Sequence, residues 1–207
     1  MPVDTSPAKP GLRERKKQQL REKIARTALR LFAERGYDET TLADIAEAAD
    51  ISPRTIFAYY ESKEDILFCE EQGFLDQLKQ KLEQRPSGIT TVDAIREFIS
   101  SVPPPDEQAM LRKKILTHSP GLQVKVRAHM GQLEPLLIES IAKDLHAGND
   151  DIRPHLLAAS MLAAFATVRD RLAKAEAGEP ISHEQAMATL DEVLEFMRGG
   201  LEALQRD

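Results

Sequence analysis

The sequence contains one cysteine, Cys69, and no tryptophan. A single thiol excludes an internal disulfide and fits a reducing, cytoplasmic environment. Aromatic residues make up 5% of the chain and hydrophobic residues 42%, so we expect an aliphatic, helical core. The longest apolar run, near Met161 to Val168, is far too short to cross a bilayer. Residues 1–11 are rich in proline and lack the apolar centre of a signal peptide, so we predict a cytoplasmic protein.

Motifs for catalysis and metal binding are missing as well. The five histidines are scattered, and none forms a metal-ligand spacing with the single cysteine. The sequence has no phosphate-binding glycine loop, nucleophile elbow or Ser/His/Asp grouping. An enzyme remains the rival class, because sequence motifs miss sites that assemble only in three dimensions. We predict a protein that is not an enzyme and needs no cofactor or metal.

The net charge of −6 is unevenly distributed along the chain. Residues 1–30 hold nine lysines and arginines against three acids, a local charge of +6, so the remainder carries −12. A basic terminal segment is attracted to DNA phosphates, whereas the acidic remainder of the chain is repelled by the duplex. A lysine-rich terminus with no partner is the alternative explanation.

Residues 40–65 predict two short helices joined by a tight turn. The Thr41 hydroxyl can cap the first helix, with Asp44 three positions later reaching back as in a capping box. Ser52 followed by Pro53 marks a second helix start. The second helix is too short to bury Phe57 and both tyrosines that follow it, so at least one ring must face outward. This pattern is typical of a DNA-reading helix-turn-helix, although a pair of ordinary surface helices would share the spacing.

Residues 31–67 resemble the TetR family of tetracycline-repressor-like regulators, without a gap. The resemblance rests on Gly36-Tyr37 after the first helix, Thr40-Thr41 before the second, and the run from Thr55 through Tyr60 to Lys63. The chain departs from the family pattern at Tyr59-Tyr60, where His-Phe is commonest, and at Phe57, which often is a tyrosine that hydrogen-bonds a phosphate. The resemblance implies a dimeric repressor that binds a near-palindromic operator and is released by a small molecule.

Within this segment we expect seven side chains to contact DNA. We expect Arg54, Thr55 and Tyr59 to contact base edges or the nearby backbone. Thr41, which caps the first helix, and Tyr60 and Lys63, which follow the second, are expected to contact phosphates. The predicted DNA-binding residues are Thr41, Arg54, Thr55, Phe57, Tyr59, Tyr60 and Lys63.

The hydrophobic periodicity predicts an all-α fold of about nine helices with no strands. We expect a disordered basic arm over residues 1–12, a three-helix DNA-binding domain over 13–62, and a ligand-binding and dimerisation domain over 63–207. Beyond the helix-turn-helix, the predicted helices cover residues 63–84, 91–102, 107–118, 121–147, 151–174 and 182–204. Pro135 lies inside one of them and predicts a kink or a break there.

The last predicted helix carries a regular apolar seam. Six residues step by three and four: Met187, Leu190, Leu194, Met197, Leu201 and Leu204. The helix at 151–174 is rich in small residues that allow close approach. We therefore expect a four-helix bundle shared with a second copy, because a twofold DNA reader needs two recognition helices about 34 Å apart. The alternative is that the apolar seam of the last helix and the small-residue face of the helix at 151–174 both pack into the core of the same protomer.

The middle helices are expected to enclose a small-molecule pocket. Residues 111–130 and 156–172 look like the regulatory domain of a TetR subgroup with acyl-CoA-like ligands, which implies a hydrophobic or acyl-CoA-like effector. A DNA-binding activator, or an architectural protein without a ligand, is the alternative function. The candidate lining residues are Phe98, Met110, Ile115, Leu116, Met130, Leu133, Leu137, Met161 and Phe165.

Overall fold

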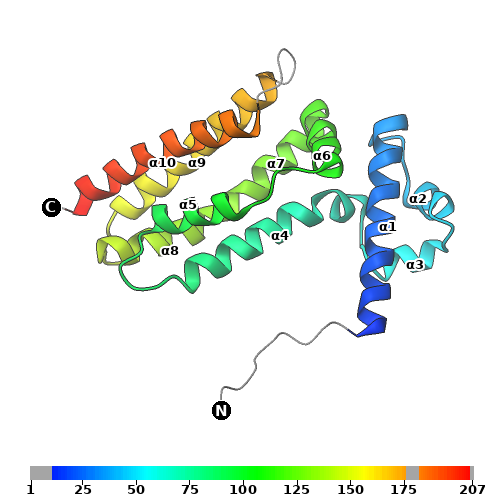
Figure 1. Cartoon of the computed structure of the whole chain (residues 1–207), viewed down its shortest axis with the longest axis horizontal. Coiled ribbons are helices and arrows are strands. Elements are labelled where there is room, and N and C mark those ends of the chain that lie inside the picture. Colours follow the sequence, from blue (N-terminus) through cyan, green and yellow to red (C-terminus); the bar gives the residue numbers. More distant parts are fainter. Residues whose placement is uncertain (1–10, 176–181, 206–207) are drawn as a thin grey trace. The chain divides into compact units, whose positions relative to one another are not determined.

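The computed structural model describes residues 11–175 and 182–205, and these residues form ten α-helices and no strand. The predicted all-α fold class is confirmed. None of the helices in these two ranges is long and apolar enough to cross a membrane. Figure 1 follows the helices in chain order, from α1 to α10. Their bounds are α1 Leu12–Arg35, α2 Leu42–Ala48, α3 Pro53–Phe57, α4 Lys63–Glu83, α5 Thr91–Ser101, α6 Glu107–His118, α7 Pro120–Gly131, α8 Leu133–Leu145, α9 Arg153–Ala175 and α10 His183–Gln205.

The chain divides into two compact units. The first contains the segment up to Cys69 together with Glu107–Ile115, and the second contains Glu70–Asp106 and Leu116–Asp207. The expected domain boundary at residue 62 lies one residue before α4, and α4 contributes residues to both units. The expected disordered arm lies almost wholly outside the described residues.

The first unit is organised around the long helix α1. Ile24 of α1, Ile45 of α2, Ile56 of α3 and Ile66 of α4 are all fully buried. Burying a side chain of this size stabilises a fold by about 1.5–3 kcal/mol. Four isoleucines, one from each helix, therefore hold the short α2 and α3 in place, although neither would be stable alone.

The second unit packs α5, α8, α9 and α10 around one apolar core (Figure 1). Helices α9 and α10 run side by side and antiparallel, and the Arg153 guanidinium at the start of α9 donates to the Leu204 carbonyl near the end of α10 over 2.9 Å. Met161 of α9 and Ile141 of α8 are fully buried at the centre.

The helix predicted over residues 121–147 is broken, as the proline within it indicated. Helix α7 ends at Gly131 and α8 begins at Leu133, with Gln132 between them. Pro135 occupies the third position of α8, where a backbone N–H has no intrahelical partner, so its missing donor costs nothing. The break is the reason that ten helices are described where about nine were expected.

Four of the six apolar seam residues of the last helix pack inside the protomer, which corrects the expected role of that part of the stripe. Leu194, Met197 and Leu201 are each 2% exposed or less and belong to the core cluster formed with α5, α8 and α9. Leu204 is partly buried against the same cluster. Three neighbouring helices cover these four seam residues, so this part of the heptad spacing reports packing within one chain, whereas Met187 and Leu190 are half-buried and lie outside the cluster.

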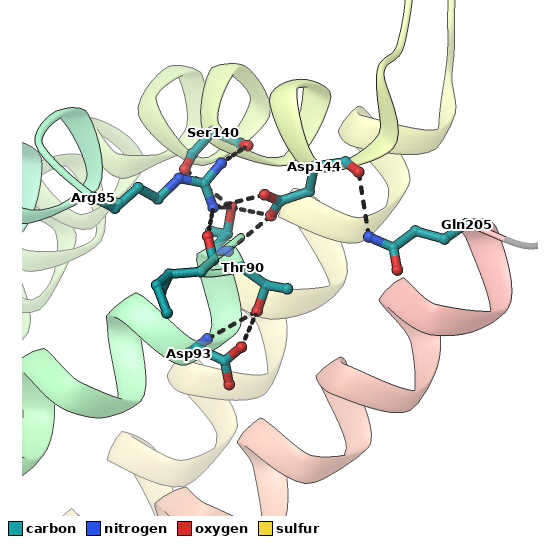
Figure 2. A network of polar contacts seen from close by, with 8 residues as sticks. Arg85, Thr90, Asp93, Ser140, Asp144 and Gln205 are labelled. Carbon is teal, nitrogen blue, oxygen red and sulfur yellow. Dashed lines mark hydrogen bonds and ion pairs between the residues drawn. The ribbon is translucent and has the colours of Figure 1, made fainter. Parts of the chain in front are cut away.

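A buried polar network closes one end of the second unit (Figure 2). Arg85, just after α4, pairs with Asp144 of α8 over 2.7 Å and donates to the Ser140 carbonyl over 2.8 Å. The Asp144 carboxylate also accepts from the backbone N–H and the hydroxyl of Thr91 at the start of α5. Gln205 of α10 donates to the Asp144 carbonyl over 3.2 Å. These contacts join the ends of four helices.

Candidate nucleic-acid interface

Helix α2 begins with the predicted capping box. The Thr41 hydroxyl accepts from the Asp44 backbone N–H over 3.1 Å, and the Asp44 carboxylate accepts from the Thr41 backbone N–H over 2.8 Å. Hydrogen bonds from the Thr41 side chain and then its backbone lower the pKa of Asp44. The reciprocal bonds satisfy two N–H groups that a helix start otherwise leaves without a partner. Thr41 itself is exposed.

The turn between α2 and α3 depends on one left-handed residue. Asp50 has φ of 54°, a conformation that few non-glycine residues adopt. Its N–H donates to the Glu47 carbonyl over 3.0 Å, and the Ile51 N–H donates to the Ala46 carbonyl over 3.0 Å. This pair of bonds is a Schellman motif, which ends a helix and redirects the chain within two residues.

Helix α3 starts as the sequence predicted. The Ser52 hydroxyl accepts from the Thr55 N–H over 3.1 Å, and Pro53 occupies the first helical position. The two hydroxyls of Ser52 and Thr55 lie 2.8 Å apart and hydrogen-bond each other. The Thr55 hydroxyl is therefore held in a fixed orientation at the start of α3.

One face of α3 is buried and the other is open to solvent. Ile56 is fully buried, whereas Phe57 is 59% exposed and Arg54 is also exposed. Thr55 and Tyr59 are partly exposed. An exposed guanidinium can hydrogen-bond a guanine edge, and an exposed ring can contact a thymine methyl group. The outward face of α3 thus presents the residue types that read bases in a major groove.

Tyr60 lies in the core, which gives it a different role from the phosphate contact expected. It is 4% exposed, and its hydroxyl donates to the Arg21 carbonyl of α1 over 3.3 Å. The Arg21 guanidinium lies 5.2 Å from the centre of the Tyr60 ring. Burial raises the pKa of this phenol. Tyr60 fastens the end of the helix-turn-helix to α1, and we leave it out of the proposed DNA contacts.

Lys63 also binds within the protein. Its ammonium group donates to the carbonyls of Tyr37, Asp38 and Thr40 over 2.8, 3.3 and 3.3 Å. It also lies 4.3 Å from the centre of the Tyr37 ring. An ammonium has three donors, so these carbonyls use its full capacity. Lys63 therefore holds the loop between α1 and α2 and is also left out of the proposed DNA contacts.

The sequence pointed to Tyr37 and Thr40 only as members of the family motif and did not predict their contact with Lys63. Burial, and then a hydrogen bond with Glu64, raise the pKa of Tyr37. Thr40 is fully buried, and its hydroxyl donates to the Gly36 carbonyl over 2.8 Å. Gly36 has φ of 95°, a backbone conformation that favours glycine. The Gly-Tyr and Thr-Thr pairs of the motif were the only sequence signal for this loop.

The structure gathers six of the nine predicted ligand-contact residues into the apolar core of the second unit. Met110 is 61% exposed, and Met110 and Ile115 belong to the first unit. Leu116 is buried, but it does not belong to that core cluster. Phe74 is an unpredicted neighbour, because its ring lies 4.9 Å from that of Phe98. The six residues in the cluster are Phe98, Met130, Leu133, Leu137, Met161 and Phe165.

Comparison with known proteins agrees with the helix-turn-helix geometry. The family model for bacterial regulatory proteins of the tetR family matches residues 24–68, and the model for the MftR C-terminal domain matches residues 90–202. The chain is 30% identical over 169 residues to the HTH-type transcriptional regulator TcmR of Streptomyces glaucescens, which covers 75% of this chain and 74% of TcmR.

Solved structures share the fold. SmeT, the repressor of the Stenotrophomonas maltophilia multidrug efflux pump SmeDEF, is 21% identical with a TM-score of 0.58, covering 85% of this chain and 89% of that chain. The fatty acid degradation regulator FadR from Bacillus halodurans is 19% identical with a TM-score of 0.56, covering 93% and 98%. At these identities the likeness shows the fold alone.

The two family models together span both units, and the second matches more than half of the chain. The similarity to TcmR extends over about three quarters of each protein. The relatives are named as transcriptional regulators and not as enzymes. The chain therefore belongs to the tetR family of bacterial regulatory proteins and is a DNA-binding transcriptional regulator.

Proposed function

We propose that this regulator is a dimeric repressor that reads a near-palindromic operator with α3 and leaves it when an apolar effector binds the second unit. The observation that carries the DNA-reading part is the open face of α3. Arg54 and Phe57 are exposed there, while Ile56 anchors the opposite face in the core. With Thr41, Thr55 and Tyr59 they make up the proposed DNA contacts, and the protein acts in the cytoplasm.

Regulators of this family bind DNA as dimers. We assign the dimer interface to the outward faces of α9 and α10, because their inward faces fill the core of the protomer. Leu156 is 55% exposed and Phe196 is 75% exposed. Small exposed residues follow each of them at helical spacing, namely Ala159 and Ala163 on α9 and Gly199 and Ala203 on α10. Two large apolar side chains among small ones suit close packing between helices.

The effector site is assigned to the interior of the second unit. The six clustered residues named above are apolar, and two of them are methionines, whose flexible side chains adapt to varied ligands. A structure of SmeT is described as a complex with triclosan, so a protein of this fold binds an apolar small molecule. An acyl-CoA-like effector follows from the resemblance of the second half of the chain to regulators with such ligands.

Helix α4 offers the route of coupling, since its backbone belongs to both units. An effector shifts the equilibrium only by its differential affinity for the two states. A coupling free energy of about 1–3 kcal/mol would lower operator affinity about 5- to 150-fold.

The test begins with selection of bound sequences from a random duplex library. We expect enrichment of a motif with twofold symmetry, and loss of affinity for that motif when long-chain acyl-CoAs or lipophilic drugs are added. Phe196→Glu should give a monomer with weakened operator binding, whereas Val124→Glu, a control at an apolar position that is 59% exposed on α7, should leave the dimer intact. A library that shows no enrichment at low ionic strength would refute DNA reading, and affinity unchanged by every ligand would refute effector release.

A further inference from the structure

The two halves of α4 are held in different apolar cores. Residues 66–68 of its first half belong to the first unit and are buried, whereas Leu75, Leu78 and Leu82 of its second half belong to the core cluster of the second unit. Each of residues 69–74, between these two anchors, is partly or largely exposed. The middle of the helix is therefore held less firmly than the parts that flank it.

The middle of α4 also contains a glycine. Gly73 is the central residue of the helix, ten residues from Lys63 and ten from Glu83. Glycine in a helix interior lowers helix stability about 2- to 5-fold relative to alanine, because it loses more conformational freedom. The Gln72 side-chain amide donates to the Asp76 carboxylate across this position over 2.9 Å, but the bond is exposed and supports the helix weakly. The residue least favourable to a helix thus lies in the least supported stretch of α4.

Neither packing nor backbone geometry requires glycine at position 73. Apart from the adjacent residues and the backbone of the helix itself, a β-carbon there would meet no atom of the described chain within 4 Å. The residue is not among those with a positive φ, unlike Gly36. At Gly200, by contrast, a β-carbon would contact the Leu157 side chain at 3.6 Å. What glycine contributes at position 73 is therefore flexibility.

A small bend at Gly73 matches the geometry of one base pair. The ten residues that precede it in α4 span about 15 Å. One added base pair moves two half-sites apart by about 3.4 Å and turns one relative to the other by about 35°. A swing of about 3.4 Å at the end of this arm is a bend of about 13°, and each protomer of a dimer takes half of the turn, about 17°. Both angles are smaller than the sharp kinks, above about 20°, that helices form at special residues.

We propose that Gly73 is a hinge in α4 that lets the regulator bind half-sites at more than one separation. The inference rests on the proposed reading of an operator by a dimer, and adds the range of operators that the protein accepts. When α4 bends at Gly73, the backbone hydrogen bonds that cross this residue open while the apolar anchors on both sides stay in place. Alanine at this position makes the bend harder, so it narrows the range of separations and leaves the best separation unchanged.

The experiment uses the enriched sequence, the twofold motif selected from the random library, with its half-sites one base pair closer, unchanged, or one base pair further apart. Affinities are compared for the wild-type chain, Gly73→Ala and Gly73→Asn. Gly73→Ala should bind the unchanged duplex like wild type and lose a further 2- to 5-fold, roughly, per protomer on the shifted ones. Asparagine is larger than alanine but favours a helix less, so Gly73→Asn should stay close to wild type. Gly121→Ala is the control, since it adds the same methyl group to an exposed position of α7.

Amide hydrogen exchange of the free protein gives a second readout. The N–H groups of residues 74–77 donate across Gly73 and should exchange faster than those of residues 79–82, and Gly73→Ala should slow them about 2- to 5-fold. A spacing profile of Gly73→Ala equal to wild type would overturn the proposal. Equal narrowing by alanine and asparagine would also overturn it, because size and not flexibility would then matter. If the library yields no twofold motif, dimeric reading fails, and the exchange experiment alone decides whether α4 bends at Gly73.

Discussion

Arg85 and Asp144 form an ion pair 2.7 Å long whose side chains are only 9% and 7% exposed. The Asp144 carboxylate receives two further hydrogen bonds from Thr91, and Arg85 donates to two backbone carbonyls, those of Ile89 and Ser140. The pair therefore carries its own hydrogen-bond shell, as a buried charge requires. It ties the chain that leaves α4 to the start of α5 and to α8.

Asp144→Asn should destabilise the second unit strongly, because it leaves the Arg85 charge buried without a counter-charge. Removing one partner of a buried pair costs about 3–5 kcal/mol. The shift of the urea unfolding midpoint measures this loss of stability. Lys143→Ala is the control, since it breaks the exposed Lys143–Glu139 pair, which should contribute less than about 1 kcal/mol. Equal effects of the two variants would contradict the role of the buried pair.

Arg54→Ala should relax base preference. A side chain that reads a base edge contributes about 1–3 kcal/mol of discrimination, so the enriched sequence should lose affinity while random DNA does not. Competition titrations with single-base variants of the enriched sequence would locate the base. Equal weakening on cognate and random duplexes would reassign Arg54 to the backbone.

Lys63→Met should lower stability and leave the salt slope of DNA binding unchanged. The substitution keeps the apolar stem and removes the donors that bind three carbonyls. A hydrogen bond from a charged group contributes about 1.5–3 kcal/mol, and we expect a total loss of about 2 kcal/mol. A lower slope at unchanged stability would instead support the phosphate contact expected from the sequence.

Asp50→Gly should raise stability slightly, because the residue has a positive φ of 54°. Relief of the left-handed conformation is worth about 1–2 kcal/mol, and the extra freedom of glycine in the unfolded chain offsets about 0.4–1 kcal/mol of it. Asp50→Val should lower stability, since a β-branched residue is strained there. Thermal unfolding of both variants tests the turn, and opposite signs are the expected result.

The capping box should make stability depend on pH through Asp44, whose pKa is lowered by Thr41. A lowered folded-state pKa stabilises the fold fully above the ordinary pKa of the carboxyl and loses that contribution as pH falls through the lowered value. The stability advantage of the wild-type chain over Asp44→Asn should therefore shrink in acid. Thr41→Val should raise the Asp44 pKa in an NMR titration, and an unchanged pKa would contradict the hydrogen bonds.

Local features were predicted well from the sequence. The capping box of Thr41 and Asp44, the Ser52 cap and the position of Pro53 all follow from neighbours within three residues. The helix bounds depend on the same short-range bonds, so they were close to the expected ranges. The Schellman motif at Asp50 was predicted only as a tight turn between two helices, because a side chain other than glycine gives no clear signal for a positive φ.

Residue roles within a helix were harder to predict. Tyr59 and Tyr60 are adjacent and chemically alike, yet Tyr60 is buried against α1 and Tyr59 is partly exposed. Spacing predicts that neighbouring side chains point in different directions, but it does not say which direction faces the core. Lys63 shows the same limit, since its three carbonyl partners lie 23 to 26 residues earlier in the chain.

The amino-acid sequence by itself determined an all-helical regulator with a DNA-reading helix-turn-helix, because caps, turns and apolar periodicity act over a few residues. Tertiary packing decided which faces remain open. The seam of α10 from Leu194 to Leu204 is covered by α5, α8 and α9, and the opening turns of α1 are left exposed. A periodic stripe specifies that a surface will be buried, whereas the partner that buries it depends on contacts between residues far apart in sequence.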